Sequence, residues 1–188
     1  MDFIALLVAL GVILLIAVVV VVLYNGLVQR RLRVDEAWSQ IDVQLKRRHD
    51  LIPNLVNAVR GYMEFEEETL TRVTQARADA VAAGARGPAD QAQAENALTE
   101  TLRSLFAVME NYPDLKANQN VLSLQEELTT TENQISFSRQ HYNATVRDYN
   151  TAIATVPAVF IAGMFGFGKR DFFEAEMAAR EVPEVRLR

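Results

Sequence analysis

The sequence predicts an all-α protein in which an N-terminal transmembrane helix precedes a long antiparallel bundle of up to four helices. Two observations carry this prediction. Phe3 to Leu23 is a run without a charged or strongly polar side chain. After it, apolar residues recur at steps of three and four, the spacing of one helix face, and no segment alternates as a strand would. The expected organisation is a membrane segment at 1–23, a bundle at 24–157, and an aromatic, glycine-rich segment with a polar tail at 158–188.

The length of the apolar run fits a membrane. An α-helix rises about 1.5 Å per residue, so the run is about 31 Å long and matches a bilayer core of about 30 Å. A lone span in lipid must satisfy its own backbone hydrogen bonds, so we expect a helix despite the run of valines. A cleaved signal peptide is the alternative, but no basic residue precedes the run, and Tyr24-Asn25-Gly26 is a poor cleavage site.

The charges beside the run predict its orientation. Arg30, Arg31 and Arg33 follow it, whereas Asp2 precedes it. The positive-inside rule therefore places the bundle in the cytoplasm and Met1 outside. Tyr24 lies where an aromatic residue favours the membrane interface, and the arginines could also bind anionic headgroups.

The bundle is expected to contain three helical segments. The first runs from Tyr24 to about Ala83, and Pro53 should kink it or break it into two near-collinear helices. Gly84 to Pro88 is a linker, after which Asp90 and Gln93 resemble a capping pair. Asn111 to Asp114 ends the second helix, and the third runs from about Asn118 to Thr155.

The segment from Ala158 to Gly168 is too short and glycine-rich to cross a bilayer. Two interpretations stay open. It packs on the end of the bundle, or its phenylalanines enter the membrane interface beside Lys169 and Arg170.

The composition argues against an enzyme. The chain has no cysteine and two histidines, His49 and His141, neither in a metal-binding motif. A site that joins both histidines through carboxylates such as Glu132 or Asp50 stays open. The net charge of −5 argues against a nucleic-acid binder. We expect no catalytic residue, no metal and no cofactor.

Polar residues near the apolar faces are the more unusual feature. Asn54 and Asn57 lie close to the stripe of the first helix and are expected to be buried. Glu132, Ser136, Arg139 and Asn143 form a polar row on the last helix. Either these residues fix the helix register through hydrogen bonds, or they contact another protein. The basic cluster Lys46 to His49 similarly faces Asp42 and Asp50 or the acids of a partner.

Long ordered motifs give a family resemblance. The chain resembles the LemA family through Tyr24-Asn-Gly-Leu-Val28, Ala37-Trp-Ser-Gln-Ile-Asp42, Lys46-Arg-Arg-His-Asp-Leu-Ile-Pro-Asn-Leu-Val56, Gly61-Tyr62, Glu110-Asn-Tyr-Pro-Asp-Leu-Lys-Ala-Asn118, Leu124-Gln125, Thr131-Glu-Asn133, Arg139, Tyr142-Asn143 and Tyr149-Asn150. The resemblance implies a single-pass membrane protein of the bacterial inner membrane with a long helical bundle and no established catalytic residue.

The expected function is a non-enzymatic scaffold that self-associates and organises membrane or protein partners. The alternative is an adaptor for another membrane protein, such as a protease or sensor kinase. The expected partners are the lipid bilayer, further copies of the chain and an unidentified membrane protein. The candidate residues are Tyr24, Arg30, Arg31 and Arg33 at the membrane, and, as motif or contact residues, Trp38, Asp42, Arg47, Arg48, His49, Pro53, Asn54, Tyr112, Pro113, Glu132, Asn133, Arg139, Tyr142 and Asn143.

Overall fold

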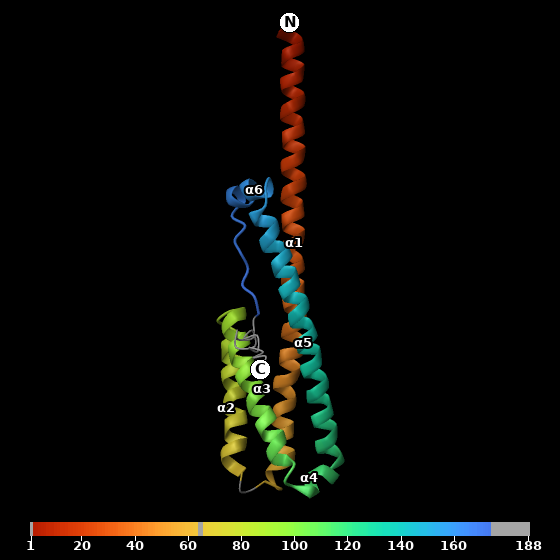
Figure 1. The fold of residues 1–188 in the computed structure, drawn as a ribbon, viewed down its shortest axis with the longest axis vertical. Coiled ribbons are helices and arrows are strands. Elements are labelled where there is room, and N and C mark those ends of the chain that lie inside the picture. Colours follow the sequence, from red (N-terminus) through yellow and green to blue (C-terminus); the bar gives the residue numbers. More distant parts are fainter. Residues whose placement is uncertain (1, 64–65, 174–188) are drawn as a thin grey trace, which may run out of the picture. The chain divides into compact units, whose positions relative to one another are not determined.

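A computed structural model describes residues 2–63 and 66–173 of the chain (Figure 1). The described residues form helices and no strand, which confirms the all-α prediction. The helices are α1 (Asp2–Arg60), α2 (Glu67–Ala83), α3 (Pro88–Met109), α4 (Pro113–Ala117), α5 (Gln119–Ala154) and α6 (Ala158–Phe165). The chain divides into two compact units. Unit 1 comprises Met1–Ser39 and Ala144–Arg170, and unit 2 comprises Gln40–Asn143 and the segment that begins at Asp171.

Unit 2 is an antiparallel helical bundle. It contains the later part of α1, α2, α3, the short α4 and the earlier part of α5. Figure 1 shows α2 and α3 side by side, running in opposite directions, and the two helices contact each other. The apolar faces that the sequence predicts meet in one core, which includes Ile52, Leu55, Val59, Val73, Leu98, Leu105, Val121 and Leu128.

The first long helix breaks at a different place from the one expected. α1 continues through Pro53 and ends at Arg60, and α2 begins at Glu67. Of the two alternatives at Pro53, the break into two helices is therefore wrong, and so is the expectation that the first segment continues to about Ala83. Proline removes the amide donor that would bond to the carbonyl four residues earlier, on His49. Arg77 Nε donates to that carbonyl at 2.6 Å instead, so the bundle satisfies the oxygen that the proline leaves open.

The reversal after α1 uses residues that do not favour a continuing helix. Glycine is about 1 kcal/mol less favourable than alanine inside a helix, and Gly61 immediately follows the last helical residue. The amides of Tyr62 and Met63 donate to Val59 O at 3.0 and 3.1 Å, which closes the final turn. Met63 is fully buried in the core, so its side chain anchors the reversal.

The linker between α2 and α3 lies where the sequence predicts it. The expected capping pair, however, does not cap the start of α3. Gly87 precedes α3 with a φ of 113°, a conformation that favours glycine, and Pro88 takes the first helical position. No side chain caps this end, so the prediction that Asp90 and Gln93 begin the helix is wrong. The proline supplies the start instead, because its fixed φ suits the first turn and its missing amide needs no acceptor there.

Unit 1 contains the earlier part of α1, the end of α5 and α6. Leu27, Val34 and Ala37 of α1 are buried, as are Val146 and Tyr149 of α5. α1 is the one helix of the described chain that is long and apolar enough to cross a membrane, and none of its apolar window is buried.

α6 has two different faces. Ala158, Ile161 and Ala162 are buried, whereas Phe160 and Met164 are 69% and 74% exposed. The Phe165 and Phe167 rings lie edge-on to Tyr24, with centroids 4.9 and 5.6 Å away. The segment thus packs on unit 1 through one face and presents apolar side chains on the other.

Candidate functional site

A buried charge network crosses the interior of unit 2. Arg48 of α1 is 1% exposed and forms an ion pair with Glu95 of α3, which is equally buried. Arg48 Nη1 also donates to Glu132 Oε2 of α5 at 2.5 Å and to Thr99 Oγ1 of α3 at 2.9 Å. One guanidinium therefore joins three helices, which fixes their register because its planar donors accept few alternative geometries.

His49 adds a second contact to the same carboxylate. Its Nε2 lies 2.8 Å from Glu95 Oε1, although the two atoms are not aligned as a hydrogen bond. Burial alone raises the pKa of the Glu95 carboxyl, but His49 and Arg48 together outweigh it and hold that pKa below its ordinary value. Glu95 is thus held as an anion inside the bundle.

The network reaches the surface beside Glu132, whose side chain is 40% exposed. A shallow cavity of about 180 Å³ opens there, between α3 and α5. Leu102, Phe106 and Leu128 supply its apolar wall, while Thr99 and Asn133 supply polar groups. Because Glu95 and Glu132 already pair with Arg48, their charges are not available to a ligand in the cavity. A ligand would contact mainly its apolar wall.

The polar row of α5 has different roles along its length. Arg139 Nη1 donates to Asn96 Oδ1 of α3 at 3.0 Å, and its guanidinium lies 4.9 Å from the centre of the Phe173 ring. Burial and the nearby Arg48 lower the pKa of Arg139, and Glu132 opposes the shift. Ser136 is exposed. Glu132 and Arg139 therefore contact side chains of other helices in unit 2.

Asn143 and Tyr142 hold the chain segment that follows unit 1. Asn143 Nδ2 donates to Phe173 O at 3.0 Å, and the Phe173 amide donates to Asn143 Oδ1 at 2.9 Å. Tyr142 Oη donates to Asp171 O at 2.9 Å. Phe173 is fully buried, so this segment is part of the packed structure of unit 2.

Other candidate residues of unit 2 lie outside the network. Arg47 is exposed and forms an ion pair with Glu127 at 3.6 Å. Asp42 and Asn54 are exposed, as is Asn57. The expectation that both asparagines are buried is wrong, because each lies one position off the buried face that Leu55 and Val56 define.

The remaining motif residues mark the ends of elements or pack beside them. Tyr112 precedes α4, and Pro113 takes its first position. The Tyr112 hydroxyl lies 3.5 Å from Glu66 Oε1. Trp38, in unit 1, is half-buried. Proline at the start of α4 has the same explanation as Pro88, since neither ring removes a donor that the helix uses.

In unit 1, an asparagine of α5 binds the backbone of the chain after α6 through two hydrogen bonds, as Asn143 binds Phe173 in unit 2. Asn150 Nδ2 donates to Arg170 O at 2.9 Å, and the Arg170 amide donates to Asn150 Oδ1 at 2.9 Å. Arg170 also forms an ion pair with Asp35 of α1 at 2.7 Å. Tyr149 Oη donates to Gly168 O at 3.0 Å, and burial raises the pKa of that hydroxyl.

Sequence reasoning did not single out Glu95 or Arg77, and it named Asn150 only as part of a family motif. Only Glu95 carried a usable signal, since it lies three residues before Leu98 and seven before Leu102, on the apolar face of α3. A charged residue on such a face needs a buried partner of opposite charge. The roles of Arg77 and Asn150 depend on backbone groups far away in the sequence, which periodicity does not reveal.

The two histidines do not form the joint site that the sequence left open. His49 contacts Glu95 rather than Glu132, and His141 is exposed. Over residues 2–63 and 66–173, no three His, Cys, Asp or Glu side chains are grouped to hold a metal ion. Glu95 and Glu132 pair instead with Arg48.

Comparisons with known proteins agree with the motifs. The family model described as LemA family matches residues 37–187. Magnetosome protein MamQ of Magnetospirillum gryphiswaldense is 24% identical over an alignment of 206 residues, which covers 96% of this chain and 75% of that protein. Magnetosome protein MamQ 2 of Paramagnetospirillum magneticum is 24% identical, over 86% of this chain and 68% of that protein.

A further relative is the protein named Protein LemA of Metamycoplasma hominis. It is 28% identical over 133 residues, which cover 70% of this chain and 59% of that protein. Together with the family match, these relatives confirm the resemblance that the motifs predicted. With the exposed apolar part of α1, they indicate association with a membrane.

Proposed function

This chain belongs to the LemA family, and on that premise we propose that it is a membrane-anchored, non-enzymatic scaffold that self-associates and organises membrane or protein partners. The observation that carries the proposal is the contrast along α1. The apolar residues of its beginning are exposed, whereas most apolar residues from Leu27 onward are buried in the cores of the two units. Lipid is the environment that removes the exposed part from water.

The charge network supports a structural role. Arg48 is bound by Glu95 and Glu132, and His49 faces the same Glu95. Catalysis by such groups needs a reactive side chain with a place for substrate beside it. Here the buried ionisable groups are engaged with one another, which favours stability and register over chemistry.

Self-association follows from confinement. Anchored copies share a plane, so their effective concentration is raised and weak lateral contacts become sufficient for assembly. Two relatives are named as magnetosome proteins, which favours a role at a membrane-bound structure. The proposed location is the bacterial inner membrane.

The proposed orientation places the N-terminus outside and the chain after the apolar run in the cytoplasm. Arg30, Arg31 and Arg33 lie on one side of the apolar run and support this orientation through the positive-inside rule. Alkaline phosphatase and fluorescent-protein fusions after Arg188 test it. Fluorescence without phosphatase activity is expected, and the reverse pattern would contradict the orientation.

The scaffold proposal is tested by extracting the full-length protein in a mild detergent and measuring its mass and shape by size exclusion and electron microscopy. A large, homogeneous homo-oligomer is expected. A monomer that co-purifies in fixed ratio with another membrane protein would overturn the scaffold and favour the adaptor instead.

A further inference from the structure

We propose that a basic groove in unit 1 binds the phosphate of an anionic phospholipid headgroup. The groove has a volume of about 460 Å³ and lies between α1 and α5. Its walls carry Arg30 and Arg33 from α1, with Arg147, Asp148 and Thr151 from the end of α5 and Thr155 directly after it. The inference rests on the proposed function, because it requires the apolar part of α1 to lie in a bilayer.

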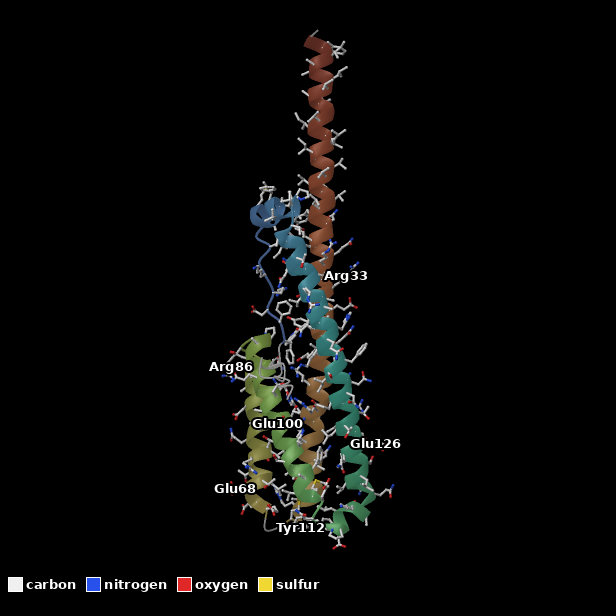
Figure 2. All side chains as sticks on the ribbon, in the orientation of Figure 1. Arg33, Glu68, Arg86, Glu100, Tyr112 and Glu126 are labelled. Carbon is white, nitrogen blue, oxygen red and sulfur yellow. The ribbon has the colours of Figure 1, made fainter. Side chains whose placement is uncertain are left out.

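The charge of the groove selects an anion. Three of the residues that line it are arginines, against the single carboxylate of Asp148. Arg170 and Arg48 each pair with carboxylates, but no acidic group lies within 4.0 Å of Arg33 or Arg147 in the part of the chain that the structure describes. Figure 2 labels Arg33 on α1. Guanidinium groups bind phosphate oxygens through paired hydrogen bonds, which makes phosphate a matching ligand.

The position of the groove selects a lipid as the source of that phosphate. Arg30 is seven residues beyond Leu23, about 10 Å along the helix, and the headgroup layer extends about 5–7 Å beyond the core. Helical side chains lean toward the N-terminus, which here is toward the membrane. Arg30 follows this rule, since its Nη1 donates to Gly26 O at 3.3 Å, one turn nearer the apolar run. Its guanidinium therefore lies at headgroup depth.

The groove also contains a neutral donor. Thr151 lines the α5 side with a hydroxyl group, whereas the Thr155 hydroxyl already donates to Ala152 O at 3.2 Å. Hydroxyl and guanidinium donors on opposite walls can bind different oxygens of one phosphate. This arrangement distinguishes a shaped site from a diffuse basic surface.

The test uses the full-length protein in a mild detergent, titrated with phosphatidylglycerol and with phosphatidylcholine and followed by native mass spectrometry. We expect a preference for phosphatidylglycerol that R33Q/R147Q reduces about twenty-five-fold, since each arginine near an anionic headgroup contributes about fivefold. The control R72Q/R86Q removes the same charge at exposed positions of unit 2 and should keep the preference. An absent preference, or an equal loss in both variants, would overturn the site.

Two further arms keep the result decisive. D148N removes the carboxylate of the groove and should strengthen phosphatidylglycerol binding about fivefold, whether or not R33Q/R147Q folds; no increase would count against the site. Inorganic phosphate is titrated in parallel. Displacement of the lipid by submillimolar phosphate would overturn the lipid assignment in favour of a soluble phosphate ligand.

The anchoring itself is checked by alkaline carbonate extraction of membranes that contain the protein. If the protein stays in the membrane but shows no preference for phosphatidylglycerol, only the proposed headgroup site is contradicted. If carbonate releases the protein, the membrane anchoring on which the proposed function depends is contradicted.

Discussion

Arg77 Nε donates a 2.6 Å hydrogen bond to the carbonyl oxygen of His49. This carbonyl lies four residues before Pro53, so it is the one that the proline leaves without its helical donor. A side chain of α2 thus completes the backbone of α1, which explains how α1 passes through a proline and still contributes to the core of unit 2.

We predict that R77A lowers the free energy of unfolding by about 1–3 kcal/mol, because a partly buried carbonyl oxygen loses its donor. In the P53A background the helix regains its own amide donor, so R77A should cost less there. Chemical unfolding of the solubilised protein, followed by circular dichroism, measures this double-mutant cycle. Equal costs in both backgrounds would show that Arg77 does not act through the carbonyl.

Glu95 offers a second test of the buried network. E95Q should lower the free energy of unfolding by about 3 kcal/mol, because Arg48 loses its fully buried carboxylate and keeps only Glu132, whose side chain is 40% exposed. The matched control is E100Q on the same helix, where Glu100 pairs with Arg103 at the surface and both side chains are 69% exposed (Figure 2). That change should cost well below about 1 kcal/mol. Similar losses in the two variants would contradict a special role for Glu95.

The lowered pKa of Glu95 predicts an acid-sensitive unit 2. A carboxyl whose folded pKa lies below its unfolded value of about 4.3 stabilises the fold fully above that pH. The stabilisation is lost as the pH falls from there through the folded pKa. Thermal unfolding between pH 6 and pH 2 should show this loss in the wild type and a flatter profile in E95Q. Parallel profiles would mean that other carboxylates cause the acid sensitivity.

Asn143 is predicted to hold the segment around Phe173. N143A removes two hydrogen bonds to the Phe173 backbone and should expose this amide to faster hydrogen exchange, by about tenfold or more for an opening eased by about 1.4 kcal/mol. S136A changes an exposed residue of the same row and should leave the exchange rate unchanged. Unchanged exchange in N143A would show that the packing of Phe173 suffices.

The exposed face of α6 is predicted to enter the membrane interface. The chain contains no cysteine, so F160C can carry a nitroxide label selectively. In vesicles this label should be protected from a water-soluble relaxation agent and accessible to oxygen. F137C is the control, because Phe137 of unit 2 is 71% exposed and Phe160 is 69% exposed. Equal access of the water-soluble agent to both labels would contradict membrane contact by α6.

The helices of this protein could largely be predicted from its sequence. Helical periodicity is local, so the apolar run, the linker before Pro88 and the long helix that ends at Ala154 all follow from residues close together in the chain. The break after Arg60 was misplaced because Pro53 is the stronger local signal, and its cost is removed by a residue of another helix.

The sequence by itself determined an apolar span, a set of amphipathic helices and a family. Only the tertiary structure decided which polar residues belong together: Arg48 with Glu95 and Glu132, Arg77 with the His49 carbonyl, and Arg33 with Arg147 across a groove. The physical reason is that helix formation and apolar faces are encoded over a few turns. The partner of a long polar side chain depends instead on the register between helices, which packing sets over many tens of residues.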